Sequence, residues 1–349
     1  MRMLPLVVFM AAACAEAAPT PADVPRESAA SLTSSAVPVT AMTQNMYVGA
    51  DLDAVIAALA SPDTSDDFPA LLNGIQTLAV TDYPARAGAL AAEIVRARPD
   101  VVGLQEVSKI DITIPGVVDL HIDFLPVLLD SLAAQGAHYV AAASVLNIVA
   151  TPVPGIELHD FDVMLVNSDR VTVTGATGRN YAANLGVVAP GVELKRGYVV
   201  VQSLVAGQPV TFASTHLESG DSPGLPDLRA AQATELAGAL PTGTPVYVMG
   251  DFNDVPGSPA YQVMQGAGLT DTWGTLKPSQ PGLTCCETPD LGTQTNVFDQ
   301  RIDYVWTTLP VSNGSATIER VGERPGDRVA GTVHPIWPSD HAGLVFKTR

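Results

Sequence analysis

The chain has 349 residues, and 47% of them are hydrophobic while 15% are charged. This composition can bury a sizeable core, which excludes a wholly disordered protein. Acidic residues outnumber basic ones by 36 to 18, and the formal net charge of −18 argues against a broad basic face that binds nucleic acid. The surplus of carboxylates suits good solubility, binding of divalent cations, or both.

The first segment has the pattern of an export signal. One basic residue precedes the apolar stretch Met3–Ala13, which is too short to span a bilayer and is typical of a secretory signal peptide. Two processing sites are open: an A-x-A site at residues 15–17, or a lipobox-like run of alanines before Cys14, which would then carry a lipid anchor. We predict a signal peptide over residues 1–17 and a flexible linker over the polar, proline-rich residues 18–36. The protein is expected to be exported, either secreted or periplasmic, or anchored to the membrane as a lipoprotein.

The rest of the chain, residues 37–349, predicts one layered α/β domain. Short apolar runs with many β-branched residues and Gly, Pro or Asp borders indicate buried strands. In chain order they are Val37–Thr43, Val101–Leu104, Val163–Val166, Val171–Thr174, Tyr198–Val205, Val210–Ser214, Val246–Met249, Ile302–Thr307 and Leu344–Lys347. Helical periodicity and capping residues predict helices over Pro84–Arg98, Phe124–Gln135 and Asp227–Leu240. Helices dispersed among many strands favour a layered α/β protein over an all-β sandwich.

Polar side chains stand at the ends of six predicted strands. They are Asn45, Gln105-Glu106, His216, Asp251 with Asn253, Asp303, and Asp340-His341. A carboxylate at the end of a buried strand costs several kcal/mol unless it is paired. A hard cation with oxygen ligands would pair with several of these groups at once.

These strand ends carry sequence motifs that resemble one known family. The motifs are, in order, Gln44-Asn45-Met46-Tyr47, Gly103-Leu104-Gln105-Glu106-Val107, Ser214-Thr215-His216-Leu217, Gly250-Asp251-Phe252-Asn253, Arg301-Ile302-Asp303-Tyr304 and Ser339-Asp340-His341. The chain resembles the endonuclease/exonuclease/phosphatase superfamily over roughly Val39–Phe346, and the six motifs stand in the family's order. The resemblance implies a four-layer α/β/β/α sandwich, in which two packed β-sheets are flanked by helices.

The resemblance also implies a divalent metal site for Mg²⁺ or Mn²⁺. Glu106 would bind the ion, with Asn45 nearby as a metal or phosphate ligand. Asp340 would bind metal or support the site. Asp51 is a further candidate ligand, although capping of a following helix explains this residue equally well.

The catalytic groups implied by the resemblance are five. Asp251 would orient or deprotonate the attacking water, and Asn253 would hold a phosphoryl oxygen. His341 would stabilise the developing charge or exchange a proton, and His216 would donate a second hydrogen bond to the phosphate. Asp303 would fix the orientation of an imidazole.

The expected activity is in-line hydrolysis of a phosphoester by an exported, metal-dependent enzyme. Arg196 could bind the phosphate, the alternative being a solvated residue at the start of a strand. The substrate could be nucleic acid, as for a nuclease-type phosphodiesterase, or a phospholipid head group or inositol phosphate, as for a sphingomyelinase-like enzyme. A non-catalytic surface-binding module of the same fold is a third possibility. We infer no protein partner and expect a monomer, with substrate choice residing in loops such as Ser108–Asp123 and Leu146–His159.

The cysteines exclude a scaffold built on disulfides, since the chain has three. Cys285 and Cys286 are adjacent, and neighbouring residues do not easily reach normal disulfide geometry. No CxxC or Cys/His spacing indicates a zinc site. The motifs assign no role to this pair.

Overall fold

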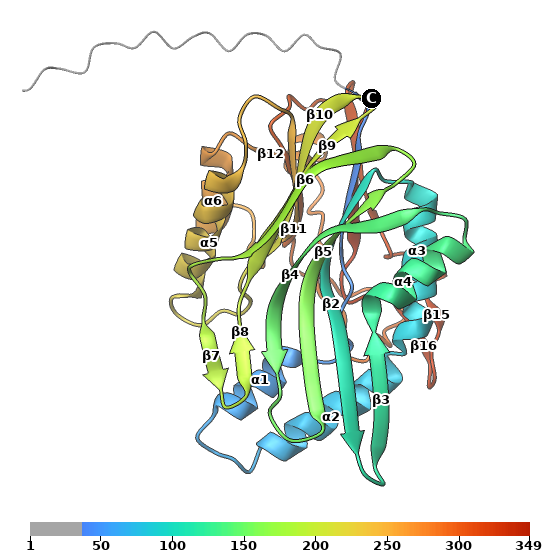
Figure 1. Ribbon diagram of the computed structural model, residues 1–349, viewed down its shortest axis with the longest axis vertical. Coiled ribbons are helices and arrows are strands. Elements are labelled where there is room, and N and C mark those ends of the chain that lie inside the picture. Colours follow the sequence, from blue (N-terminus) through green and yellow to red (C-terminus); the bar gives the residue numbers. More distant parts are fainter. Residues whose placement is uncertain (1–36) are drawn as a thin grey trace, which may run out of the picture. The chain divides into compact units, whose positions relative to one another are not determined.

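The computed structural model describes residues 37–349 (Figure 1). The predicted signal peptide, the predicted linker and the candidate lipid anchor Cys14 therefore lie outside the described residues. Among the helices described, none combines the length and apolar character that crossing a bilayer would require.

The larger β-sheet contains nine strands within the described residues. Their order is β14 (Ala316–Val321), β17 (Gly343–Thr348), β1 (Thr40–Asn45), β2 (Val101–Ile114), β5 (Ile156–Asn167), β4 (Tyr139–Ala150), β8 (Val192–Leu194) and β7 (Gly186–Ala189), and β3 (Val118–Asp123) pairs with β2. β1 and β2 are parallel, with Asn45 paired to Gln105. β1 therefore ends beside Gln105, whereas β2 continues past that point to Ile114.

The smaller sheet contains six strands in the described part of the chain. Their order is β12 (Thr270–Asp271), β13 (Asp303–Thr307), β11 (Val246–Asp251), β10 (Gln208–His216), β9 (Gly197–Val205) and β6 (Val171–Asn180). β10 and β11 are parallel, and His216 pairs with Asp251 at their ends. A separate two-stranded ribbon joins β15 (Val329–Ala330) and β16 (Pro335–Ile336).

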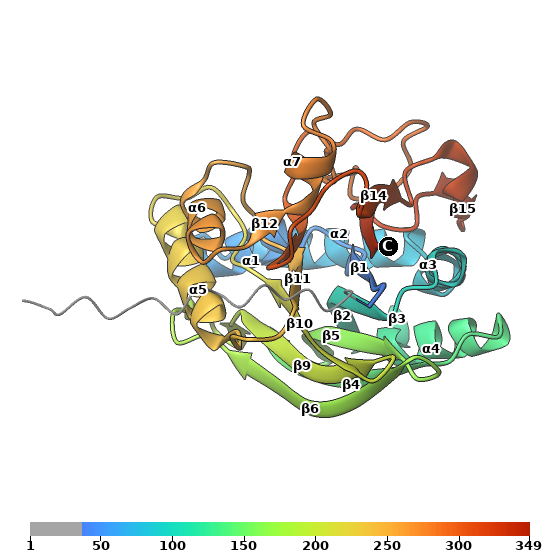
Figure 2. The ribbon, with the colours of Figure 1, turned by 90° about the horizontal axis from the view of Figure 1, so that it is seen from above.

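Helices cover the outer face of each sheet, and the two sheets pack face to face (Figure 2). The larger sheet packs on α1 (Leu52–Ala60), α2 (Asp67–Val80), α3 (Tyr83–Ala97) and α4 (Phe124–Ala134), and the smaller sheet on α5 (Leu225–Ala239) and α6 (Pro259–Gly266). The short α7 (Thr272–Leu276) packs beside β13 and β14. Three buried apolar clusters separate the four layers, and the middle one joins side chains of both sheets. The predicted four-layer α/β/β/α sandwich is confirmed.

The capping residues explain where α3 begins and ends. The carboxylate of Asp82 accepts a hydrogen bond from the backbone N–H of Ala85, and Pro84 occupies the first turn. Arg98 ends the helix in the left-handed conformation at φ 50°. The prediction of a helix over Pro84–Arg98 is therefore confirmed to within one residue at each end.

The two segments predicted as substrate-selecting loops are β-hairpins instead. Residues 108–123 continue β2 and turn into β3, while residues 146–159 hold the end of β4 and the start of β5. Apolar side chains alternate along the end of β2 at Ile110, Ile112 and Ile114, which is the period of a strand with one covered face. This alternation marks the segment as a strand, so the loop prediction was wrong.

Candidate active site at the strand ends

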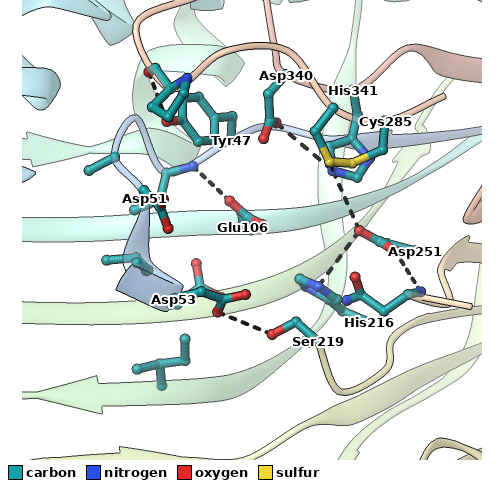
Figure 3. A pocket seen from close by; sticks show the side chains of 18 of the residues that line it. Tyr47, Asp51, Asp53, Glu106, His216, Ser219, Asp251, Cys285, Asp340 and His341 are labelled. Atoms are coloured by element: carbon teal, nitrogen blue, oxygen red, sulfur yellow. Dashed lines mark hydrogen bonds and ion pairs between the residues drawn. A yellow bond between two sulfur atoms is a disulfide. The ribbon is translucent and has the colours of Figure 1, made fainter. Parts of the chain in front are cut away.

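The strand ends of both sheets surround one pocket of about 290 Å³ (Figure 3). It lies at the carboxyl ends of β1 and of the parallel strands β10 and β11. Glu106 reaches it from a bulge within β2, not from the strand end that the sequence predicted, because β2 continues to Ile114. Eight of the ten predicted site residues line it: Asp51, Glu106, Arg196, His216, Asp251, Asn253, Asp340 and His341. The other two, Asn45 and Asp303, are hydrogen-bonded to lining residues. The structure thus brings together groups that are up to 296 positions apart in the chain.

Asn45 connects the carboxylates of the two sheets. Its Nδ2 donates to Glu106 Oε1 at 2.9 Å and to Asp251 Oδ2 at 3.2 Å. Glu106 lies in a β-bulge of β2 at φ 56°, and its Oε2 accepts from the backbone N–H of Val48 at 2.8 Å. A left-handed backbone is unfavourable for a glutamate and persists only where its surroundings hold it, as is typical of functional sites.

His341 is held between carboxylates. Its Nδ1 donates to Asp303 Oδ2 at 2.8 Å, and its Nε2 lies 3.7 Å from Asp251 Oδ2. Burial lowers the pKa of His341, but Asp303 and the other carboxylates outweigh it and raise this pKa well above the ordinary value. The imidazole is therefore protonated at neutral pH and can donate from Nε2 into the pocket.

His216 lies on the other side of Asp251 and has the opposite charge preference. Its Nε2 is 3.7 Å from Asp251 Oδ2, and its Nδ1 accepts from Arg196 Nη1 at 3.2 Å. An arginine can only donate, so Nδ1 carries the lone pair and the proton is on Nε2. Burial, Arg196 and His341 lower the pKa of His216 well below its usual range. Asp251 is thus placed between a protonated and a neutral imidazole.

Asp251 itself is tuned by burial and by its neighbours. Burial and the charge of Asp303 raise the pKa of Asp251 to about 7, against the opposing effect of His341. The backbone N–H of Asn253 donates to its Oδ1 at 2.8 Å and fixes the carboxylate. The side-chain amide of Asn253 donates to the carbonyl of Leu217 at 3.0 Å, which orients that amide at the pocket wall.

Arg196 is buried rather than solvated. Its Nε pairs with Glu218 Oε1 at 3.3 Å, and its Nη2 donates to Ser219 Oγ at 3.2 Å. Ser219 in turn donates to Asp53 Oδ1 at 3.1 Å, which links the guanidinium to α1 (Figure 3). The alternative of a solvated strand start is wrong, because the pairing with Glu218 draws the side chain inward.

Asp51 and Asp340 occupy the wall formed by loops. Asp51 caps α1, since its Oδ1 accepts from the backbone N–H of Ala54 at 2.9 Å, and it also lines the pocket. Burial raises the pKa of Asp340 to about 7, and the nearby charge of Glu106 adds to this rise. Because Asp51 both caps α1 and lines the pocket, the structure gives a geometric basis to each of its two possible roles, helix cap and metal ligand.

Two buried acids at the site were missed by the sequence reasoning. Asp160 lines the pocket and accepts from Ser108 Oγ at 2.7 Å, and burial together with the charge of Glu106 raises its pKa to about 7. Asp162 lies 3.9 Å from His216 Nδ1, and burial and Asp160 raise its pKa well above its ordinary value. The signal was two acids at a spacing of two, which places them on the same face of a strand, directly before the apolar run Val163–Val166.

The residues present fit a hard divalent cation. Glu106, Asp251 and Asp340 line one pocket, and Asp303 lies behind it on His341. Burial is the main cause that raises the pKa values of Asp251 and Asp340, and a bound cation would offset the cost of burying their charges. The donor atoms of Glu106 and Asp340 are carboxylate oxygens, which Mg²⁺ and Mn²⁺ prefer over softer ligands. Asn45 directs its Nδ2 at Glu106 and Asp251 while its Oδ1 accepts from the backbone N–H of Tyr47, so ligation through its oxygen requires this amide to turn over.

The sulfur atoms of Cys285 and Cys286 are joined in a disulfide at the edge of the pocket (Figure 3). The sequence had led us to expect no disulfide between these neighbouring cysteines, and the structure differs from that expectation.

Comparisons with known proteins agree with this architecture. The sequence model of the Endonuclease/Exonuclease/phosphatase family matches residues 42–341. A family protein from Leptotrichia buccalis has a similar structure, with a TM-score of 0.57 and 16% identity over 89% of this chain and 99% of that one. A second family protein, from Beutenbergia cavernae, has a TM-score of 0.56 and 24% identity, and the match covers 89% of this chain and 71% of that one. The structure of the human Nocturnin catalytic domain with bound sulfate anion has a TM-score of 0.53 and 17% identity, and the match covers 89% of this chain and 94% of that one. No curated protein matches the sequence. At these identities the structural likeness shows the fold.

Proposed function

Since the chain belongs to the endonuclease/exonuclease/phosphatase family, whose members are phosphoester hydrolases, we propose that it is a divalent-metal-dependent hydrolase of phosphoesters. One observation carries the proposal: Asp251 lies 3.7 Å from the Nε2 atoms of both His216 and His341, whose pKa values are shifted in opposite directions. Titratable groups with diverging pKa values in one pocket are typical of acid–base catalysis.

Each of these groups has a distinct part in the proposed reaction. Asp251 aligns the attacking water and accepts its proton. His341, protonated and held by Asp303, donates to the charge that grows on the phosphoryl oxygens, and neutral His216 donates from Nε2. The amide of Asn253 keeps one N–H for a phosphoryl oxygen, since its other N–H is bound by the carbonyl of Leu217.

Glu106, Asn45 and Asp340 would hold the cation, with Asp51 as a further oxygen donor. A divalent ion there would neutralise the phosphate and stabilise the charge on its oxygens. Arg196 supports this arrangement by fixing the tautomer of His216, and its guanidinium faces the pocket as a candidate phosphate contact.

The test is hydrolysis of bis-p-nitrophenyl phosphate by the full chain. We expect turnover that EDTA removes and Mg²⁺ or Mn²⁺ restores. Asp251→Asn and His341→Ala should abolish turnover with an unchanged circular dichroism spectrum, whereas the exposed control His138→Ala should keep the wild-type rate. Wild-type rates from either site variant would contradict the assignment.

A second observation favours a phosphoester that carries an apolar group. An apolar groove of about 440 Å³ lies between α1, α2 and the two hairpin tips, where Phe68 is 68% and Val117 71% exposed. A narrower apolar cavity shares the wall residues Ile56 and Ile148 with the active-site pocket, and Leu71 and Ile75 with the groove. A phospholipid would place its head group in the pocket and an acyl chain in this groove.

The substrate class is decided by a metal-dependent screen. Sphingomyelin vesicles, inositol phosphates, plasmid DNA and RNA are compared with EDTA controls. Preference for the vesicles, with a rate reduced by Phe68→Ser, supports the lipid substrate. Preference for DNA, unaffected by Phe68→Ser, contradicts it and supports a nuclease.

We also propose export, on the pattern of residues 1–17. Mass spectrometry of the exported protein distinguishes the two processing sites. A lipid on Cys14 as the new N-terminal residue supports the anchor, an unmodified terminus beyond Cys14 supports release, and an unprocessed Met1 contradicts export.

A further inference from the structure

The cysteine pair lies on a loop that is fixed to the catalytic histidine. Cys285 forms an antiparallel bridge with His341. On either side, the N–H of Ala342 donates to the carbonyl of Thr284 at 2.8 Å, and the N–H of Glu287 to that of Asp340 at 3.0 Å. The loop and the His341 segment therefore hold a fixed register.

Both sulfur atoms lie close to the reactive nitrogen of that histidine. Cys286 Sγ is 4.0 Å from His341 Nε2, and the two Sγ atoms and Nε2 all lie within 4.8 Å of one another. Three ligands of one tetrahedral zinc ion are about 3.5 Å apart. Reduction of the disulfide would free the two sulfurs to move apart toward that separation.

The other ring nitrogen of His341 has the partner that a metal-binding histidine requires. Nδ1 is hydrogen-bonded to Asp303 Oδ2 at 2.8 Å, which orients Nε2 toward the sulfurs. A carboxylate on the far nitrogen is the usual support of a ligating imidazole. Asp251 Oδ2 lies 3.7 Å from the same Nε2 atom.

We propose that Cys285, Cys286 and His341 form a binding site for a soft cation such as Zn²⁺, which becomes available when the disulfide is reduced. Thiolate and imidazole ligands select zinc over magnesium. This donor set is distinct from the oxygen ligands Glu106, Asn45 and Asp340 of the catalytic ion. A soft cation on Nε2 occupies the atom that would donate to the phosphoester, so occupancy inhibits hydrolysis.

The chemical steps balance with a dithiol as reductant. The S–S bond of the protein breaks, its two sulfurs gain two electrons and two protons, and the dithiol becomes a disulfide. Binding of the cation then displaces the two thiol protons, and a proton from His341 when the imidazole is charged. Exchange with a small-molecule disulfide reverses the reduction: the S–S bond of the protein re-forms, the disulfide takes up the two electrons and two protons from water to become thiols, and the cation is released.

The binding test uses cobalt as a probe and does not depend on activity. The full chain is reduced with a phosphine, which becomes a phosphine oxide with oxygen from water, and is titrated with Co²⁺ alone. We expect sulfur-to-cobalt absorption bands that saturate at one ion per chain and that Zn²⁺ abolishes. Cys14→Ala, which removes the third thiol, should keep these bands.

Two controls should lack the bands: the unreduced chain and the Cys285→Ser/Cys286→Ser variant. The unreduced chain is the wild-type protein, so its result does not depend on how the variant folds. Bands missing from the reduced wild-type chain, or persisting in either control, would overturn the proposed site.

The inhibition test rests on the proposed function and is read separately. With Zn²⁺ about 100-fold above its dissociation constant, hydrolysis by the reduced wild-type chain should fall about 100-fold, and that by the double serine variant should not. Equal inhibition of both would overturn the inhibitory role. If no phosphoester is hydrolysed at all, the proposed function fails while the cobalt result still decides the site.

Discussion

Replacing Glu93 with glutamine tests how burial sets charge in this fold. Glu93 lies on α3, is 2% exposed, and has no hydrogen-bond partner on either carboxylate oxygen among the described residues. Burial, with a further contribution from the charge of Asp327, raises its pKa from 4.5 to about 8. A native group with a raised carboxyl pKa keeps a proton that the unfolded chain has already released.

The sign and size of the effect follow from this difference. Below about pH 4.5 the carboxyl is protonated in both states; between about 4.5 and 8 only the native state binds the proton, so the free energy of unfolding falls as pH rises. The complete loss, reached above about pH 8, is about 5 kcal/mol. Since globular domains are stable by about 5–15 kcal/mol, this loss is large enough to measure.

Urea unfolding followed by far-ultraviolet circular dichroism, from about pH 5 to about pH 9, measures the effect. Glutamine resembles the protonated carboxyl and stays uncharged, so Glu93→Gln should match the wild type at low pH and exceed its stability increasingly as pH rises. The exposed Glu319 on β14 provides the control, and Glu319→Gln should leave the pH dependence unchanged. A stability difference between Glu93→Gln and wild type that is constant across pH would refute the reasoning.

Three further substitutions test the site and its supports. Asp303→Asn removes the charge that keeps His341 protonated, so kcat should fall roughly 10²–10⁴-fold without loss of fold. The exposed control Asp299→Asn should keep the wild-type rate. An unchanged kcat in Asp303→Asn would contradict the role of this pairing. Arg86→Lys loses the planar set of donors and should lower the free energy of unfolding by about 2–4 kcal/mol, and an unaltered urea midpoint would argue against this. Gly103→Ala would place a methyl group 2.5–2.9 Å from side chains of the opposite sheet. We therefore expect the free energy of unfolding, measured by thermal unfolding, to fall by about 1–3 kcal/mol. Wild-type stability would show that the two sheets can move apart to accept the methyl group.

The position of the site could be predicted because its residues follow short apolar strands. Asn45 and Asp251 each end a short buried strand, and Glu106 follows the predicted run Val101–Leu104 although β2 continues to Ile114; that information is local. Parallel pairing then brings such ends together at one edge. In the structure Glu106 and Asp251 line one pocket and Asn45 is hydrogen-bonded to both, while the roles of all three stay predictions.

Elements that depend on partners elsewhere in the chain were not predictable in this way. β4 is rich in alanine, which favours helices, and it is a strand because it pairs with β5 along nearly its whole length. The first half of β5 carries the polar residues Glu157, His159, Asp160 and Asp162, so the strand was recognised only from Val163 onward. A buried acid is costly by itself, and only the assembled pocket, with Arg196 and Ser108 close by, shows why two are tolerated here.

Arg86 shows how residues outside the strand-end motifs can position the site. It is fully buried on α3, and its Nη1 donates to the carbonyls of Met46 at 2.6 Å and Pro338 at 3.1 Å, while Nη2 donates to that of Tyr47 at 3.0 Å. Met46 and Tyr47 directly follow Asn45 in the chain, and Pro338 stands two residues before Asp340. One guanidinium therefore fixes the backbone of both loops that carry candidate metal ligands. Burying this charge is costly, so the carbonyls that offset the cost must stay in place. The same contacts offset the burial of Arg86 and hold the two loops. Loosening the Asn45 loop or the Asp340 loop would therefore also destabilise the packing of α3. The geometry of the pocket is thus coupled to the stability of the helical layer behind it.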